Sequence, residues 1–118
     1  MRYILALLCL LASAGVASAQ PVQYRSNGGF EYRGLADTGA IARAETALAA
    51  DSMSVQRIID LGVAQSGARQ FREAIATFSR GIRIAPNDPM LYRWRGHRYL
   101  SVREIGRASC RERVWIPV

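Results

Sequence analysis

The chain has 118 residues, half of them hydrophobic, and its 16 basic and 9 acidic residues give a formal net charge of +7. A chain of this length forms one domain at most. Its four prolines and ten glycines are close to ordinary frequencies, which excludes a collagen-like or wholly low-complexity protein. One histidine and two cysteines leave little material for a metal site, so we expect neither a metal nor a cofactor.

The first nineteen residues have the layout of a secretory signal peptide. An arginine follows Met1, an apolar run covers Tyr3–Ala12, and Ala17–Ala19 gives the small-x-small pattern that signal peptidases cleave. The apolar run is too short to cross a bilayer core of about 30 Å. We predict a signal peptide over residues 1–19 with cleavage after Ala19, no later membrane span, and a secreted or periplasmic protein. Retention of the segment as an uncleaved anchor is the alternative. The signal and the exclusive use of arginine as basic residue favour a bacterial source.

After the predicted signal peptide, the composition of the chain changes near residue 38. Residues 20–37 are polar, contain three glycines and show no helical period, which predicts a flexible leader with one short extended piece at 30–32. Beyond it, Ile41, Ala44 and Leu48 recur at helical spacing and predict a helix within 38–53.

Three further helices follow, which together predict an all-α fold. The second helix begins after Ser54 as N-cap and ends near Ser66, because Gly67 is expected to break it. The third covers about 69–84 and stops before Pro86. The fourth runs from Asp88-Pro89, a capping residue followed by proline in the first turn, to about residue 101.

Large, small and aromatic residues recur at fixed offsets between Ile58 and Pro86. Leu61-Gly62 follows Ile58 by three residues, and Ala74 precedes Phe78 by four. This spacing resembles the tetratricopeptide repeat, a helical hairpin of about 34 residues in which such residues pack the two helices together. The sequence departs from the family pattern with Ile58 in place of tryptophan and Gln65 in place of tyrosine. The residues that carry the packing signature are Leu61, Gly62, Ala64, Phe71, Ala74, Phe78 and Pro86.

A second copy of the pattern begins one repeat length after the first. Gly96 is the counterpart of Gly62 in this register, and Tyr92 and Tyr99 flank it as packing positions of the second copy, although Arg95 replaces the expected leucine. The resemblance implies antiparallel helix hairpins of a tetratricopeptide-type α-solenoid. Its parts are a half repeat at 38–53, a full repeat at 55–88 and the start of the next repeat at 89–104.

The resemblance also implies a binding surface. In such repeats the first helix of each pair lines a concave groove that receives a partner peptide. The register places on this groove Gln56, Ile59, Val63 and Ser66, followed by Met90, Arg93, His97 and Leu100. Because Arg93 and His97 lie one helical turn apart, we expect them to bind one carboxylate of the partner together.

Two other function classes are weaker on sequence grounds. The aromatics and arginines of 92–99 could stack on bases and pair with phosphates, but the repeat register uses several of them for packing, and export disfavours a nucleic-acid partner. No glycine-rich phosphate loop, metal-ligand spacing or nucleophile beside a base is present, so we expect no enzyme. We therefore predict a scaffold of the periplasm or cell envelope that binds another protein. An accessory repeat arm of a longer envelope enzyme is the alternative.

The end of the chain resembles translated sequencing adapter. Codon by codon, the eleven residues 104–114 match translation of a widely used short-read adapter, and Glu112 stands where the repeat requires the counterpart of Phe78. We predict that 105–118 is a non-native tail; a genuine C-terminal cap helix is the alternative. Without the signal and the tail, Cys9 and Cys110 are both lost, and 12 arginines against 8 acidic residues leave a net charge of +4 over 20–104.

Sequencing of the source DNA tests the predicted tail. Amplification of the locus and reading across codon 104 is expected to show a different reading frame from that point onward. The same fourteen codons in the genomic product would establish the tail as part of the natural protein.

Overall fold

The computed structural model describes residues 19–112, and within them the side chains of all residues except 104 and 106–112. Nearly all of the predicted signal peptide, and residues 113–118, therefore lie outside the described residues. The described chain is mostly helical, as predicted, and also contains one small two-stranded sheet that the predicted all-α fold did not include. Its helices are α2 (Ala40–Ala50), α3 (Val55–Gly67), α4 (Phe71–Ile84) and α5 (Pro89–Glu112). None of these described helices is both long and apolar enough to span a membrane.

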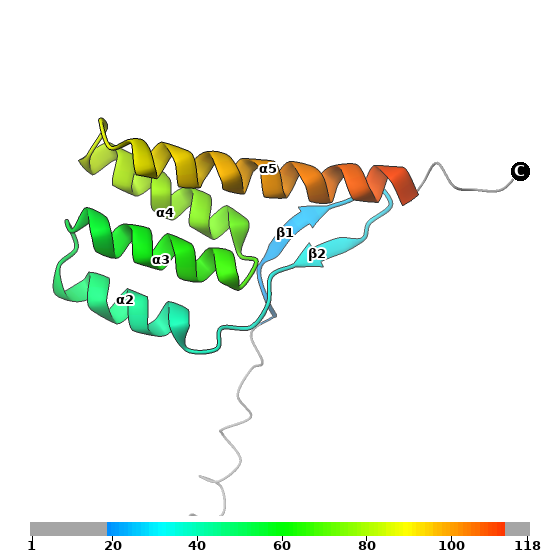
Figure 1. Cartoon of the computed structure of the whole chain (residues 1–118). Helices are drawn as coiled ribbons and strands as arrows, with labels where there is room; N and C mark the ends of the chain where they lie inside the picture. Colours follow the sequence, from blue (N-terminus) through cyan, green and yellow to red (C-terminus); the bar gives the residue numbers. More distant parts are fainter. Residues whose placement is uncertain (1–18, 113–118) are drawn as a thin grey trace, which may run out of the picture.

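Consecutive helices alternate in direction and are joined by short turns (Figure 1). Helix α4 contacts both α3 and α5, whereas α2 contacts α3. The fourth helix differs from its prediction, because α5 continues past Ser101 to Glu112 and so enters the predicted non-native tail. Residues 102–112 contain one glycine and no proline, so nothing in the local sequence stops the helix.

Two helices begin in the same way, one repeat length apart. Helix α3 starts at Val55 and α5 at Pro89, and each start is preceded by a capping side chain. The Ser54 hydroxyl accepts a hydrogen bond from the backbone N–H of Arg57 at 3.4 Å, as the sequence predicted. At the second start, the Asp88 carboxylate accepts from the N–H of Met90 at 2.9 Å.

The turn between α3 and α4 depends on Arg69 rather than on Gly67. Gly67 is the last residue of α3, and Arg69 follows with φ of 54°, the left-handed conformation that glycine usually supplies at a helix end. The N–H of Arg69 donates to the carbonyl of Ser66 at 3.0 Å, and the N–H of Gln70 donates to that of Gln65 at 2.9 Å. These two bonds satisfy the last carbonyls of α3 and reverse the chain into α4.

The core is centred on the ring of Phe78. Phe78 is fully buried, and a Cβ built on Gly62 of α3 would lie 2.4 Å from its Cε1 atom, so only glycine allows this approach. The ring also stacks on Trp94 of α5, with ring centroids 6.3 Å apart. Phe78 therefore connects α3, α4 and α5. A second group, Ile41, Leu48, Ile58 and Leu61, joins α2 to α3.

An antiparallel hairpin occupies the region predicted to be a flexible leader. Strands β1 (Val22–Arg25) and β2 (Glu31–Arg33) pair with Tyr24 opposite Tyr32, and the predicted extended piece at 30–32 overlaps β2. Glu31 forms ion pairs with Arg25 and with Arg33. The hairpin lies beside the second half of α5 (Figure 1).

Gln23 fixes this hairpin to the helices. Its side chain is almost fully buried, its side-chain carbonyl accepts from the N–H of Arg72 at 2.8 Å, and its amide nitrogen donates to Glu73 at 2.7 Å. The N-cap residue of α4, Gln70, makes no capping bond with its own side chain, so Gln23 takes that role. The prediction of a flexible leader was wrong for 22–33, because the partners of Gln23 lie about fifty residues away and leave no local signal.

Replacement of Phe78 tests the position of the core. Phe78→Ala removes a fully buried ring that touches three helices, and we expect a loss of about 3–5 kcal/mol in the free energy of unfolding. Denaturant unfolding followed by circular dichroism measures it, with exposed Phe30 as the matched control (Phe30→Ala). A loss below about 1 kcal/mol would place Phe78 outside the core, given the usual cost of truncating a buried phenylalanine.

Candidate partner-binding surface

The predicted groove residues of α3 divide into exposed and half-buried positions. Gln56 is exposed and donates from its amide to the carboxylate of Asp60 at 2.8 Å, and Val63 is 39% exposed. Ser66 is partly buried, with its hydroxyl bonded to the carbonyl of Gly62. Ile59 instead packs against the cluster of Ala74, Phe78 and Leu91. The half-buried side chain of Ile59 therefore contributes to the core as well as to the surface.

On α5 the predicted groove residues are all exposed. Met90 and Leu100 present apolar side chains, and Arg93 and His97 lie between them, one helical turn apart. Within the described residues, no hydrogen bond or ion pair involves the side chain of Arg93 or His97. Both side chains are thus available to an acidic group of a partner.

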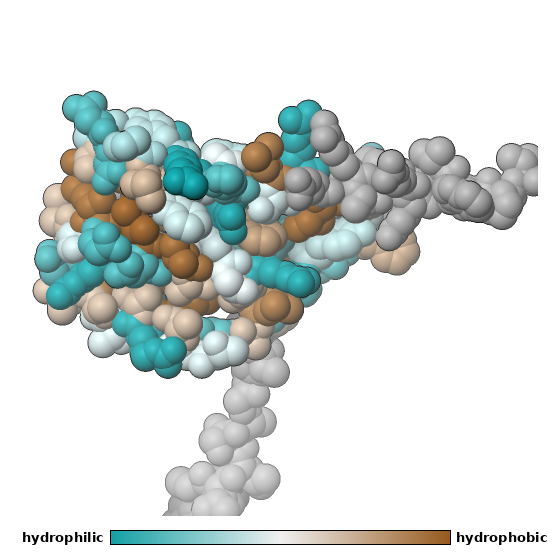
Figure 2. Space-filling view, in the orientation of Figure 1, coloured by the Kyte–Doolittle hydropathy of each residue, from teal (hydrophilic) through white to brown (hydrophobic). Residues whose placement is uncertain are grey.

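The core connects the α3 and α5 parts of this surface. Ile59 of α3 and Trp94 of α5 pack against the same Ala74–Phe78–Leu91 cluster. Figure 2 shows a band of hydrophobic surface crossing the helices at the end of the molecule away from the hairpin, flanked by hydrophilic side chains. The arrangement can hold a peptide through apolar contacts and a charge-assisted bond. Within the described residues, no three potential metal ligands lie close enough together to hold a metal ion.

The predicted packing residues of the two copies are placed very differently. In the first copy Leu61, Gly62, Ala74 and Phe78 are buried, while Ala64 and Phe71 are partly buried and Pro86 is exposed. In the second copy Tyr92 is 44% and Tyr99 55% exposed, and Gly96 is also exposed. These three residues do not pack as predicted, because no described helix covers α5 in the way that α4 covers α3.

Two side chains of α5 lean on neighbouring helices as the sequence predicted. Trp94 stacks on Phe78, and the guanidinium of Arg98 lies 5.6 Å from the ring centroid of Phe71. The Nε atom of Arg98 is buried without a hydrogen-bond partner. Cation–π attraction to Phe71 compensates part of that loss.

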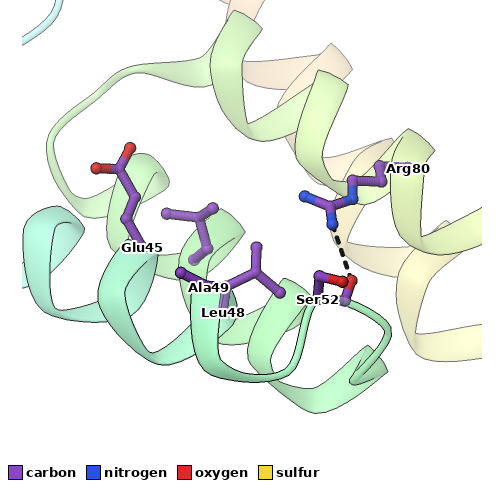
Figure 3. Close-up of a pocket in the computed structure, with 6 residues that line it drawn as sticks. Glu45, Leu48, Ala49, Ser52 and Arg80 are labelled. Atoms are coloured by element: carbon purple, nitrogen blue, oxygen red, sulfur yellow. Dashed lines mark hydrogen bonds between the residues drawn. The ribbon is translucent and has the colours of Figure 1, made fainter.

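The helices α2, α3 and α4 form a hollow that the sequence analysis did not predict. It has a volume of about 320 Å³, and its floor includes Leu48 and Leu61. Glu45 and Arg80 lie on its two sides, and Arg80 donates to the carbonyl of Ser52 at 2.8 Å (Figure 3). Residues from separate helices, distant in the sequence, form this hollow, so no sequence spacing marks it.

Asp37 lies at the end of the predicted leader but caps helix α2. Its carboxylate accepts from the N–H groups of Ile41 at 2.9 Å, Ala42 at 3.0 Å and Gly39 at 3.0 Å. These bonds, those of Ile41 and Ala42 foremost, hold the pKa of Asp37 below its ordinary value of 3.8. Asp37 also lines a surface hollow of about 310 Å³ between residues 35–40 and the end of α3. It acts as a cap, with no second ionisable group lining that hollow.

Comparisons with known proteins identify no relative of this chain. A scan against protein-family models finds no matching family, and searches of curated proteins and of solved structures find no match. The tetratricopeptide resemblance thus stays a prediction from residue types and their spacing.

The capping role of Asp37 predicts an acid-sensitive start of α2. Since its pKa is lowered in the folded chain, the cap contributes at neutral pH and is lost as the pH falls below 3.8 and through the folded pKa. An NMR titration should show the amides of Ile41 and Ala42 shifting together with the Asp37 carboxyl. In Asp37→Asn, which keeps one acceptor oxygen but does not titrate, this shift should disappear. A carboxyl that titrates at or above 3.8 would contradict the cap.

Proposed function

We propose that the chain is a protein-binding scaffold of the periplasm or cell envelope, built as a tetratricopeptide-type α-solenoid. Its partner protein or peptide lies across α3 and α5, on the surface formed by Gln56, Ile59, Val63, Arg93 and His97. The proposal involves no enzymatic step, cofactor or nucleic acid.

The repeat part of the proposal is supported by helix starts as well as by packing residues. Helices α3 and α5 begin one repeat length apart, at Val55 and Pro89, and the residue before each start, Ser54 or Asp88, caps the helix with its side chain. Capping and glycine placement thus recur with the period of the proposed family. A single helical hairpin would not require such a period.

The observation that carries the binding part is the exposure of Arg93 and His97 on α5, whose side chains form no hydrogen bond or ion pair within the part of the chain that the structure describes. Arginine offers a planar set of donors that matches both oxygens of a carboxylate, and a histidine one turn away adds a further donor. The charge of the surrounding helix favours the same partner, since residues 89–104 contain four arginines and one acidic residue, Glu104. Val63 and the half-buried Ile59 supply apolar contact from α3.

Reversal of one charge tests this surface. Arg93→Glu is expected to weaken binding of an acidic peptide by about ten- to a hundredfold, because a charge-assisted hydrogen bond contributes roughly 1.5–3 kcal/mol. Fluorescence anisotropy of a labelled acidic, leucine-containing peptide titrated with the full chain measures the affinity.

The matched control makes the same charge change on another helix. Arg83 is exposed in the last turn of α4, so Arg83→Glu should leave the affinity within about twofold, as expected of a screened charge outside the contact. Equal effects of the two variants would mean that net charge alone drives binding. A steep loss of affinity with salt for single-stranded DNA, with no binding of the peptide, would instead favour a nucleic-acid partner.

A further inference from the structure

The tip of the β1–β2 hairpin presents an asparagine directly before a glycine. Asn27 and Gly28 lie in the turn between the two strands, and both are exposed. The chain contains one other asparagine, Asn87, which is exposed in the turn between α4 and α5. The two asparagines differ in the residue that follows them and in the hydrogen bonding of its N–H group.

Three other backbone N–H groups of the hairpin tip are hydrogen-bonded. The N–H of Ser26 donates to the carbonyl of Phe30 at 2.9 Å, and that of Gly29 donates to the carbonyl of Ser26 at 3.0 Å. The N–H of Phe30 donates to the Ser26 hydroxyl at 3.1 Å. Among the described residues, the N–H of Gly28 has no acceptor, and the side chain of Asn27 makes no hydrogen bond. The nitrogen of Gly28 and the side-chain amide of Asn27 are therefore both free to react with each other.

The turn that contains Asn87 holds the following N–H group in a hydrogen bond. The N–H of Asp88 donates to the carbonyl of Ala85 at 3.2 Å, and the Asp88 carboxylate caps α5 through the N–H of Met90. Asp88 also carries a side chain, which hinders the approach of its nitrogen to a neighbouring amide, whereas Gly28 carries none. Asn87 is thus a comparison site within the same chain, with a similar exposure but a restrained neighbour.

We propose that Asn27 is a site of spontaneous covalent modification, at which the side-chain amide is lost as ammonia. Asparagine is one of the thermolabile residue types, and here its amide stands beside an unrestrained nitrogen. The Gly28 nitrogen attacks Cγ of Asn27, and the new C–N bond closes a succinimide ring. The bond from Cγ to the side-chain nitrogen breaks, and that nitrogen leaves as ammonia with the proton that the Gly28 nitrogen gives up. No oxidation or reduction takes place.

Water then opens the ring at either of its two C–N bonds. Hydrolysis between Cγ and the Gly28 nitrogen gives aspartate and restores the original backbone. Hydrolysis between the backbone carbonyl carbon of Asn27 and that nitrogen gives isoaspartate, whose main chain runs through Cγ and is longer by one methylene group. Both products carry a new carboxylate. The charge of residues 22–33, which contain two arginines and one glutamate, therefore falls from +1 to zero.

The two products affect the hairpin differently. Aspartate keeps the length of the turn, whereas isoaspartate lengthens the backbone between Ser26 and the N–H group that closes on its carbonyl. The stems of the hairpin are anchored outside this turn. The side chain of Gln23 accepts from the N–H of Arg72, and the N–H of Leu35 donates to the carbonyl of Ala68 at 2.7 Å. These anchors all precede position 104, so the site does not depend on the predicted tail, and the change stays within the tip.

Peptide mapping of the aged chain tests the proposal. The full chain is kept in warm, mildly alkaline buffer, and samples are digested with trypsin, which cleaves after arginine and yields separate peptides 26–33 and 84–93 for the two asparagines. Mass spectrometry follows the conversion of amide to acid in each peptide. We expect Asn27 to convert at least about tenfold faster than Asn87, with aspartate and isoaspartate both present. Conversion at Asn27 that is no faster than at Asn87 would overturn the proposal.

A variant at Gly28 tests the role of its nitrogen. Gly28→Ala places a side chain beside the attacking atom, and a Cβ built there lies 3.7 Å from the Phe30 ring, an ordinary contact that leaves the turn in place. The conversion of Asn27 should then slow at least about tenfold. Gly67→Ala is the matched control, because Gly67 also has open space around it but does not follow an asparagine, and the rate should stay unchanged.

An unchanged rate in a folded Gly28→Ala chain would also overturn the proposal. The comparison of Asn27 with Asn87 needs no variant, so it decides the question by itself if Gly28→Ala fails to fold.

Hydrogen exchange of the aged chain locates the effect of isoaspartate. The N–H groups of Ser26 and Gly29 should exchange faster than in the fresh chain, whereas those of Arg72 and Leu35 should keep their protection, because their acceptors lie outside the turn. Loss of protection at Arg72 would overturn the confinement of the change to the tip. The modification does not rest on the proposed binding surface, so the rates at the two asparagines are decided independently of any peptide titration.

Discussion

The close approach of the Phe78 ring to Gly62 is the contact on which the helical arrangement depends. A ring that lies 2.4 Å from where a Cβ would stand requires glycine in the middle of α3, although glycine weakens a helix interior by up to about 1 kcal/mol. Burial of the ring and its stacking on Trp94 outweigh that cost, since a fully buried phenylalanine contributes more than the glycine loses. Gly81 of α4 allows a similar close approach, because the absence of a side chain there makes room for Leu91 of α5. The order of α3, α4 and α5 thus follows from two glycines and the side chains that fill them.

The hairpin supplies a hydrogen-bond acceptor for the first turn of α4. A helix begins with N–H groups that need acceptors, and α4 follows a turn so tight that its own N-cap side chain supplies none. Gln23 reaches this helix end from β1 and satisfies one of these groups with a buried carbonyl, while Gly34 passes close to Gln70 on the return. The hairpin is therefore part of the packed structure.

Local patterns in the sequence predicted the helices well and their connections less well. Apolar spacing and the Ser54 cap act within one or two turns, so α3 follows from them. The surface positions of Val63, Arg93 and His97 were implied by the tetratricopeptide resemblance instead. The role of Gln23 depends on partners in α4, and the left-handed Arg69 takes a place where the sequence pointed to Gly67. Ile59 shows how far the candidate surface could be predicted from the sequence. Its position on α3 was predictable, but its contact with the Phe78 cluster arises only when α4 and α5 come together.

Helix α5 exposes two stripes of residues that differ in character, one with Arg93 and His97 and one with Tyr92, Gly96 and Tyr99. The stripe of Arg93 and His97 has charged groups beside a closed core, so it can select a partner by charge without large apolar burial. The stripe of Tyr92, Gly96 and Tyr99 instead has two half-exposed tyrosines and open space over the glycine. A glycine in a helix interior costs stability unless something uses its space, as Phe78 uses that of Gly62. Within the described residues nothing fills the space over Gly96, and the predicted repeat assigns that space to the second helix of the next repeat.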